Sequence, residues 1–308
     1  MREETVTLVD EIRRLRKQKK AILLAHNYQR PEIQDIADYV GDSIGLCRRA
    51  MEEKDAKIII FSAVDFMAES AAILNPDKKV FIPSLGARCP MAHMLPAEDV
   101  RLWKKKHPGE PVVLYVNTLA ESKAECDVCC TSANAVKVVN SLDADTVIFG
   151  PDNNLAWNVQ QKTGKKIISI PKDGFCPTHL LFQEEEILFL KEEYPDAVVA
   201  VHPECTPEVQ SIADFVGSTS QICEYARESS AKKYLIGTEV GIIHRLEKEN
   251  PDKIFIPAYD GAVCTNMKLN TLKRIYLSLK EERYPVTVPD SVARKARKAL
   301  ERMVAIPK

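Results

Sequence analysis

Three cysteines recur in similar surroundings and could together bind a metal centre. Cys89, Cys176 and Cys264 are 87 and 88 residues apart. Each lies on a loop after a run rich in β-branched and aromatic residues, in the segments KKVFIPSLGARCP (78–90), KKIISIPKDGFCP (165–177) and DKIFIPAYDGAVC (252–264). A long fixed period indicates an internal repeat. If the repeats pack about one axis, three thiols that are distant in sequence meet at one point.

A single cysteine near a strand end usually packs as a small hydrophobic residue, but three at one period favour metal binding. Two kinds of metal centre fit. Zinc would take the three thiolates together with His179 as a fourth ligand. A cubic four-iron, four-sulfur cluster has a threefold axis, so three thiolates would bind three irons and leave the fourth iron open. An open iron can act as a Lewis acid on carboxylate and hydroxyl oxygens, which suits dehydration chemistry.

Polar residues end the first predicted strand of each repeat. The predicted strands cover residues 21–28, 111–118 and 197–204. Their ends carry His26 and Tyr28, Tyr115 and Asn117, and His202 and Glu204. Small hydroxyl residues then open amphipathic runs and are predicted to be helix N-caps: Ser43, Ser132, and Ser218 with Thr219.

The elements between these residues repeat as well. Second strands are predicted at 57–62, 145–150 and 232–237, each followed by an acidic residue, Asp65, Asp152 or Glu239, at the start of another helix. The third strand of each unit is the run before the cysteine. Three units of strand, helix, strand, helix, strand predict an α/β fold with three similar three-layer αβα domains, whose parallel sheets surround a pseudo-threefold axis. The expected domains are 1–105 with an N-terminal helix, 106–192, and 193–308 with C-terminal helices. Functional loops follow the carboxyl ends of parallel strands, where all of the marked residues fall.

Composition narrows the function classes. The chain has 308 residues, of which 45% are hydrophobic, and a net charge of −1, so it can bury a large core and lacks the basic field of a nucleic-acid binder. It has no apolar run near the length of a membrane span and no signal peptide, so we expect a cytoplasmic protein.

Nine cysteines in a reducing compartment favour metal binding or catalysis over disulfides. The CDVCC segment (126–130) has no second CxxC pair nearby, so Cys126, Cys129 and Cys130 are not predicted as ligands. Cys47, Cys205 and Cys223 are predicted to pack.

Several longer segments resemble the quinolinate synthase family of bacterial and archaeal NAD biosynthesis. They are AHNYQRPEIQDIADYVGDS, VDFMAESAAILNP, YVNT, TSANA, VHPEC and GSTSQ, together with the three cysteines. The resemblance runs from about residue 20 to about residue 280. It implies three α/β domains around a 4Fe-4S cluster held by Cys89, Cys176 and Cys264. It also implies condensation of iminoaspartate with dihydroxyacetone phosphate to quinolinate, phosphate and water, with functional coupling to L-aspartate oxidase or aspartate dehydrogenase.

This chemistry suggests roles for the polar residues. Substrate carboxylates and phosphate would bind at the helix N-termini of Ser43, Ser132, Ser218 and Thr219. Glu204 and Tyr28 are predicted to be the leading acid/base pair. His26 and His202 would hold substrate oxygens, and Tyr115 and Asn117 would orient the intermediate. His179 would bind phosphate, cap the cavity or have a structural role.

Two other function classes fit parts of the pattern. An iron–sulfur hydro-lyase acting on a small hydroxy acid is the second, although it would not need three anion-binding helix ends. A zinc-containing metabolite-binding protein is the third, although it would not need a ring of acid and base residues. Iron and sulfide content separates the third class from the other two.

Overall fold

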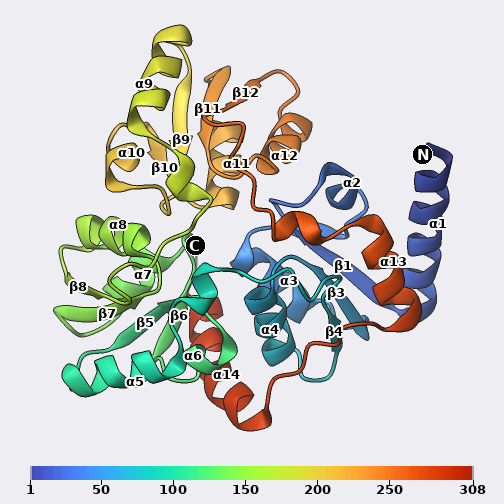
Figure 1. Cartoon of the computed structure of the whole chain (residues 1–308), viewed down its shortest axis with the longest axis horizontal. Coiled ribbons are helices and arrows are strands. Elements are labelled where there is room, and N and C mark those ends of the chain that lie inside the picture. The colour runs from blue at the N-terminus through green and yellow to red at the C-terminus, as the bar shows by residue number, and fades with distance from the viewer. Residues whose placement is uncertain (1, 307–308) are drawn as a thin grey trace.

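The computed structural model describes residues 2–306, with side chains from residue 7 onward. Three four-stranded parallel sheets form three lobes around a common centre (Figure 1). The strand orders are β2-β1-β3-β4, β6-β5-β7-β8 and β10-β9-β11-β12, so all three lobes share one topology. The predicted fold class of three similar layered α/β units is confirmed.

The first repeat begins with a long N-terminal helix. Its strands are β1 (Ala21–His26), β2 (Tyr39–Gly41), β3 (Ile58–Ser62) and β4 (Lys79–Phe81). Its helices are α1 (Arg2–Lys19), α2 (Pro31–Gln34), α3 (Ser43–Glu52) and α4 (Asp65–Leu74), followed by the short 3-10 helix η1 (Met91–His93). Strand β3 reads IIIFS and is buried throughout, as expected for a parallel strand covered on both faces.

The second and third repeats follow the same plan. The second has β5 (Val112–Tyr115), β6 (Val128–Cys130), β7 (Thr146–Gly150) and β8 (Lys166–Ser169), with α5 (Ala97–Lys106), α6 (Ala120–Lys123), α7 (Ala135–Asn140), α8 (Asn153–Thr163) and η2 (His179–Leu181). The third has β9 (Val198–Val201), β10 (Phe215–Val216), β11 (Lys233–Gly237) and β12 (Ile254–Pro257), with α9 (Glu184–Glu193), α10 (Pro207–Ser211), α11 (Thr219–Glu228), α12 (Ile242–Glu249) and η3 (Met267–Leu269).

Each sheet has one strand more than the sequence pattern predicted. The additional strands β2, β6 and β10 pair with the first strand of their repeat at the sheet edge. They are only three, three and two residues long, which is shorter than the apolar run by which a strand is recognised.

An aspartate before each edge strand fixes the amino end of its sheet. Asp38, Asp127 and Asp214 accept the backbone N–H groups of Leu23, Val112 and Val199 at 2.7, 2.8 and 2.8 Å. The same bond therefore recurs once per repeat, at the end of the sheet opposite the cysteine loops.

The two C-terminal helices return to earlier parts of the chain. Helix α13 (Leu272–Glu281) packs against α1 and β3 of the first repeat. Helix α14 (Asp290–Ala305) packs against β6 and α6 of the second repeat and against α4 of the first, and it buries Ala296, Ala299, Leu300 and Met303. Figure 1 shows α14 between these two lobes. The domain boundaries at residues 105 and 192 stay a prediction.

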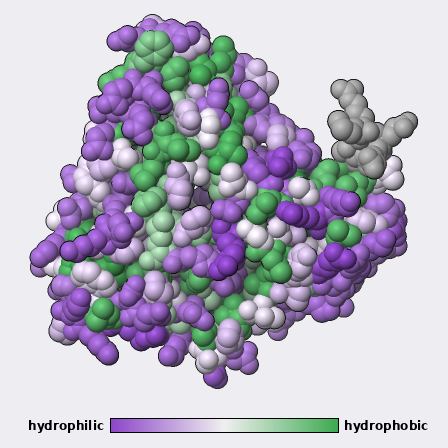
Figure 2. All heavy atoms as spheres, viewed as in Figure 1, coloured by the Kyte–Doolittle hydropathy of each residue, from purple (hydrophilic) through white to green (hydrophobic). Residues whose placement is uncertain are grey.

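The surface is mostly hydrophilic on the face seen in Figure 2, with hydrophobic side chains gathered over the upper lobe, which is the third repeat. Helix α9 of this lobe exposes Leu188 and Phe189. Among the described residues, no helix combines the length and apolar character needed to cross a bilayer.

Candidate active site

The loops after the carboxyl ends of the three sheets border one cavity with about 670 Å³ of atom-free space. The predicted site residues that line it are His26, Tyr28, Ser43, Cys89, Tyr115, Asn117, Ser132, Cys176, His179, His202, Glu204, Thr219 and Cys264. Ser218 is buried but does not line the cavity.

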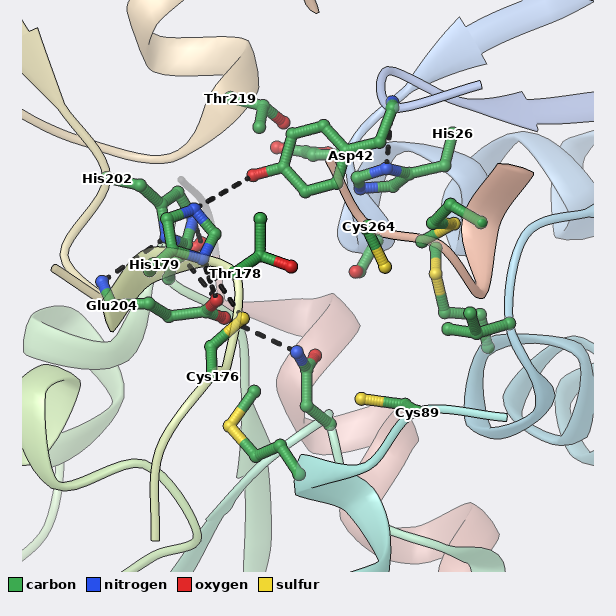
Figure 3. A pocket seen from close by; sticks show the side chains of 18 of the residues that line it. His26, Asp42, Cys89, Cys176, Thr178, His179, His202, Glu204, Thr219 and Cys264 are labelled. Carbon is green, nitrogen blue, oxygen red and sulfur yellow. Dashed lines mark hydrogen bonds and ion pairs between the residues drawn. The ribbon is translucent and has the colours of Figure 1, made fainter. Parts of the chain in front are cut away.

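The three repeat cysteines lie on equivalent loops of the three lobes. Cys89 follows β4, Cys176 follows β8 and Cys264 follows β12, and each precedes a short 3-10 helix. Figure 3 shows their sulfur atoms pointing toward a shared space. Burial raises the pKa of all three thiols; Cys264 raises the pKa of Cys89 further, and Glu204, Cys89 and Cys264 raise that of Cys176 further. A cation bound between the thiolates would remove this repulsion, so the donor set suits a metal centre.

The helix starts differ from two of the three predicted N-caps. Asp42, not Ser43, caps α3 by accepting the Gly45 N–H at 2.8 Å, and Ser43 is the first helical residue. Helix α7 begins only at Ala135, so Ser132 lies in the preceding turn and is not a cap. In both cases a nearby Asp or Asn, equally favourable at an N-cap, takes the position instead.

The third predicted cap is confirmed. Ser218 forms a capping box with Gln221: its Oγ accepts the Gln221 N–H at 3.3 Å, and the Gln221 side chain accepts the Ser218 N–H at 2.9 Å. Thr219 follows as the first residue of α11 and accepts a hydrogen bond from Asn27 Nδ2 at 2.8 Å. Only Thr219 of this pair therefore reaches the cavity.

His26 and His202 have the same local geometry in the first and third repeats. The Tyr28 N–H donates to His26 Nδ1 at 3.2 Å, and the Glu204 N–H donates to His202 Nδ1 at 3.3 Å. The proton of each neutral ring is therefore on Nε2, and in His202 this atom lies 3.2 Å from Ser132 Oγ. Burial lowers the pKa of His26 to about 4 and that of His202 to about 3. Both rings are neutral hydrogen-bond donors at neutral pH.

Glu204 is a buried carboxylate at the centre of a hydrogen-bond network. The Tyr115 hydroxyl donates to Oε1 at 2.6 Å, Asn117 Nδ2 lies 3.4 Å from the same oxygen, and His179 Nδ1 lies 2.8 Å from Oε2. Burial alone would raise the pKa of Glu204, but the neighbouring histidines and the hydrogen bonds from His179 and Tyr115 outweigh it and hold the pKa well below its ordinary value. Glu204 is therefore ionised at neutral pH.

A chain of hydrogen bonds connects Glu204 to Tyr28 through two other residues. Because His179 Nδ1 donates to Glu204, its Nε2 accepts from Thr238 Oγ1, which lies 2.9 Å away. Tyr28 in turn donates its hydroxyl proton to Thr238 Oγ1 at 2.6 Å. Burial raises the pKa of Tyr28 well above its ordinary value, with a further contribution from Glu204, so Tyr28 is protonated. This arrangement of carboxylate, imidazole and hydroxyl groups can move protons.

Sequence reasoning missed Thr238 because the repeat gives no signal for it. The equivalent positions, one residue before Asp65 and Asp152, are Val64 and Pro151. Thr238 lies behind the cavity lining; the lining residues that were missed are Asp42, Val64, Phe66, Met67, Met91, Thr131, Thr178 and Met267. Several lie in the quoted segments GDS and VDFMAES, where the apolar residues were indistinguishable from core residues.

The remaining cysteines lie outside the cavity lining. Cys126 Sγ and Cys129 Sγ are 3.7 Å apart, and Cys129 and Cys130 are buried in β6. Cys47, Cys205 and Cys223 are fully or almost fully buried, which matches the predicted packing role. Among the described residues, Cys176, His179 and Glu204 also place possible metal-ligating atoms within 4.8 Å of one another.

Comparison with known proteins gives a single family over almost the whole chain. Residues 10–305 match the model of the quinolinate synthetase A protein family. The quinolinate synthase of Methanothermobacter thermautotrophicus is 55% identical over 96% of this chain and 97% of its own length. That of Methanocaldococcus jannaschii is 50% identical over 98% and 100%, and that of Thermotoga maritima is 52% identical over 96% and 98%.

The fold, the cavity and these similarities agree. Each relative spans the repeats that supply the three cysteines, Glu204, His179 and Tyr28. The chain belongs to the quinolinate synthetase A protein family.

Proposed function

We propose that this chain is a quinolinate synthase that condenses iminoaspartate with dihydroxyacetone phosphate to give quinolinate, phosphate and water. Family membership supports the reaction. The observation that supports the proposal is the position of three thiols, one from each repeat, on the lining of one cavity beside the hydrogen-bonded chain from Glu204 to Tyr28. A binding protein would need neither feature.

Cys89, Cys176 and Cys264 would hold a 4Fe-4S cluster. Their threefold arrangement and the absence of a fourth thiol among the described lining residues suit a cluster with three protein ligands. When bound, this cluster supplies one open iron as a Lewis acid for substrate oxygens. In the alternative group of Cys176, His179 and Glu204, a metal would take His179 Nδ1 and break its hydrogen bond to Glu204.

The substrates bring two carboxylates and one phosphate, and the cavity offers uncharged donors for them. His26 and His202 are neutral rings with Nε2–H groups, and Ser132 lies beside His202. The ten-residue helices α3 and α11 begin at Ser43 and Thr219, so their free N–H groups attract anions. We assign these side chains to substrate binding.

Glu204 and Tyr28 are assigned as base and acid. The ionised Glu204 carboxylate can remove a proton from a substrate carbon or nitrogen atom, and Tyr115 and Asn117 hold the carboxylate in position. The Tyr28 phenol can protonate a leaving hydroxyl group so that it departs as water. The hydrogen bonds through Thr238 and His179 hold the Tyr28 phenol in position and link it to Glu204.

The source of iminoaspartate is a further part of the proposal. An imine of this kind hydrolyses in water, so an enzyme that oxidises aspartate must supply it continuously. We assign this role to L-aspartate oxidase or aspartate dehydrogenase, as functional rather than structural partners.

An anaerobic assay tests the function. The purified protein, reconstituted with iron and sulfide, is supplied with dihydroxyacetone phosphate and with iminoaspartate generated in the reaction mixture, and quinolinate is measured by chromatography. We expect quinolinate to depend on both substrates and on iron. An iron-loaded protein that forms no quinolinate but dehydrates a small hydroxy acid would instead identify a hydro-lyase.

Ligand variants extend the same test. Replacing Cys89, Cys176 or Cys264 by Ser should each abolish the cluster and the activity, because a cluster with three protein ligands cannot lose one. Cys126→Ser and Cys129→Ser are matched controls, since they remove thiols outside the cavity lining. Full iron content in any of the first three variants would refute the ligand assignment.

A further inference from the structure

Each cysteine loop is held at its base by a backbone hydrogen bond from the start of a neighbouring helix. The Asp65 N–H donates to Ala87 O at 2.8 Å, the Asn153 N–H to Gly174 O at 2.9 Å, and the Val240 N–H to Ala262 O at 3.1 Å. In all three repeats the accepting carbonyl lies two residues before the cysteine. The loops are therefore fixed at the same point, but this bond alone does not set the direction of the cysteine itself.

A carboxylate makes a second bond at the cysteine in two of the repeats. Asp65 Oδ1 accepts the Cys89 N–H at 3.0 Å, and Glu239 Oε1 accepts the Cys264 N–H at 3.1 Å. Both carboxylates belong to the acidic positions that recur every 87 residues. Bonds from an amide to a charged acceptor are stronger and more directional than neutral ones.

Asp152 occupies the same position in the second repeat but makes no such bond. It is fully buried, and its Oδ1 accepts the Leu155 N–H at 2.7 Å. Its Oδ2 has no hydrogen-bond partner among the described residues, and burial together with Glu204 raises the pKa of Asp152 well above its ordinary value.

Basic side chains of the cysteine loops contact the two outer carboxylates. His93 Nε2 lies 2.9 Å from Asp65 Oδ2, and Lys268 Nζ lies 2.9 Å from Glu239 Oε1. His93 and Lys268 each come four residues after the cysteine, where the second repeat has Leu180. Each carboxylate thus contacts its loop at the cysteine N–H and again four residues later, which a simple helix cap would not do.

We propose that Asp65 and Glu239 are positioning residues that orient the Cys89 and Cys264 loops, so that these thiols face one metal centre together with Cys176. Neither of them needs to be a ligand. This inference rests on the proposed function, because it assumes that Cys89, Cys176 and Cys264 hold the cluster. Residues that orient metal ligands commonly change metal affinity by 10-fold to 100-fold when they are replaced.

The test measures two quantities. One is the rate at which the reconstituted protein releases iron to a ferrous chelator, and the other is the urea concentration at which half of the protein is unfolded. Asp65→Ala and Glu239→Ala should each release iron about 10-fold faster than the parent. Asp65→Asn keeps an oxygen that can accept the Cys89 N–H, so it should restore release to within about threefold of the parent and remains informative if the alanine variant folds poorly.

Asp127→Ala is the matched control, because it removes the same kind of carboxylate-to-amide bond at the other end of the second sheet. It should lower the urea midpoint without changing iron release. The proposal is overturned if Asp127→Ala accelerates release as much as the other alanine variants, or if those variants release iron at the parent rate. A parent that holds iron but makes no quinolinate would overturn the function alone, whereas a parent that binds no iron would overturn both.

Discussion

Glu204 lies where side chains of two repeats meet. It comes from the third repeat, whereas Tyr115, Asn117 and His179, which contact its carboxylate, all come from the second. Their hydrogen bonds keep the group ionised in a buried position. Such a carboxylate can serve as a base that accepts a proton from a substrate in the cavity.

Replacing Glu204 by Gln should remove this base while keeping the size of the side chain. We expect kcat to fall by about 10² to 10⁴, the usual effect of losing a positioned acid or base. The iron content and the binding of substrate should stay unchanged. The anaerobic quinolinate assay checks the rate; near-normal turnover would exclude Glu204 from catalysis, and loss of iron would assign it a structural role.

Thr238 should matter through its hydroxyl group alone. Thr238→Val keeps the shape of the side chain but breaks the connection between Tyr28 and His179, so we expect kcat to fall by about 10-fold to 100-fold with the cluster spectrum unchanged. Thr238→Ser restores the hydroxyl and should recover most of the activity. Equal kcat values for the Thr238→Val and Thr238→Ser variants would show that no proton passes through this position.

The two neutral histidines predict how stability depends on pH. In the unfolded chain each histidine binds a proton below pH 6.5, whereas folded His26 and His202 do so only near pH 4 and pH 3. The unfolded state therefore binds more protons in this window, and stability must fall as the pH falls from about 6.5 to about 4. The slope approaches about 2.7 kcal/mol per pH unit for two groups.

Urea unfolding of the cluster-free protein at several pH values measures this slope. His26→Asn keeps an acceptor for the Tyr28 N–H and should reduce the slope to about half. An unchanged slope in this variant would mean that His26 is not held neutral by burial.

At the scale of single elements, one buried side chain in each repeat forms hydrogen bonds with the loop that follows the first strand of that repeat. Gln210 Nε2 donates to Pro203 O at 2.9 Å and to Cys205 O at 2.7 Å, both in the loop that carries Glu204. Gln34 makes the same kind of bonds, to Asn27 O and Gln29 O, in the first repeat. At the equivalent position of the second repeat, Lys123 is fully buried and donates to Thr118 O.

Gln210→Ala should therefore destabilise the protein by about 1 to 3 kcal/mol, because it leaves buried carbonyl groups without a donor. Gln183→Ala is the control: Gln183 makes a single exposed hydrogen bond, to Leu180 O, and its loss should change stability by less than about 0.5 kcal/mol. Denaturant unfolding compares the two. Equal effects would show that the Gln210 bonds add nothing beyond those of an exposed side chain.

The central strands could be predicted from sequence because they are continuous apolar runs, as in β3, and because their period repeats. The edge strands could not, since β10 has only two residues and owes its existence to pairing with β9. In the cavity, the period revealed the cysteines and the residues that end the first strands. It could not reveal Thr238, whose counterparts are Val64 and Pro151, nor that Asp42 rather than Ser43 caps its helix.

In the whole molecule, α14 links the first two lobes. Arg48 of α3 donates to Val304 O at 2.9 Å, and Asn134 Nδ2 donates to Met303 O at 3.1 Å. Asn134 also accepts the Thr131 N–H at 2.8 Å, and Thr131 lines the cavity. The last helix therefore supports the site without contacting it.

Leu300→Ala should lower the free energy of unfolding by about 2 to 5 kcal/mol, the usual effect of truncating a fully buried leucine. Glu301→Ala, on the exposed side of the same helix, should change stability by less than about 0.5 kcal/mol. Thermal unfolding of the cluster-free protein distinguishes them. A small effect for Leu300→Ala would mean that α14 is not part of the cooperative core.

The position of α14 also bears on events during synthesis on the ribosome. When only the first two repeats have emerged, the nascent chain has two of the three thiols and lacks Glu204, Thr238 and the helix that packs between its first two lobes. The proposed cluster could form only after Cys264 has been made, and the contact surface between the first two lobes stays uncovered until residues 290–305 leave the exit tunnel. Under this proposal metal insertion would follow the synthesis of Cys264, and a ribosome-stalled fragment that ends before Cys264 should not retain iron.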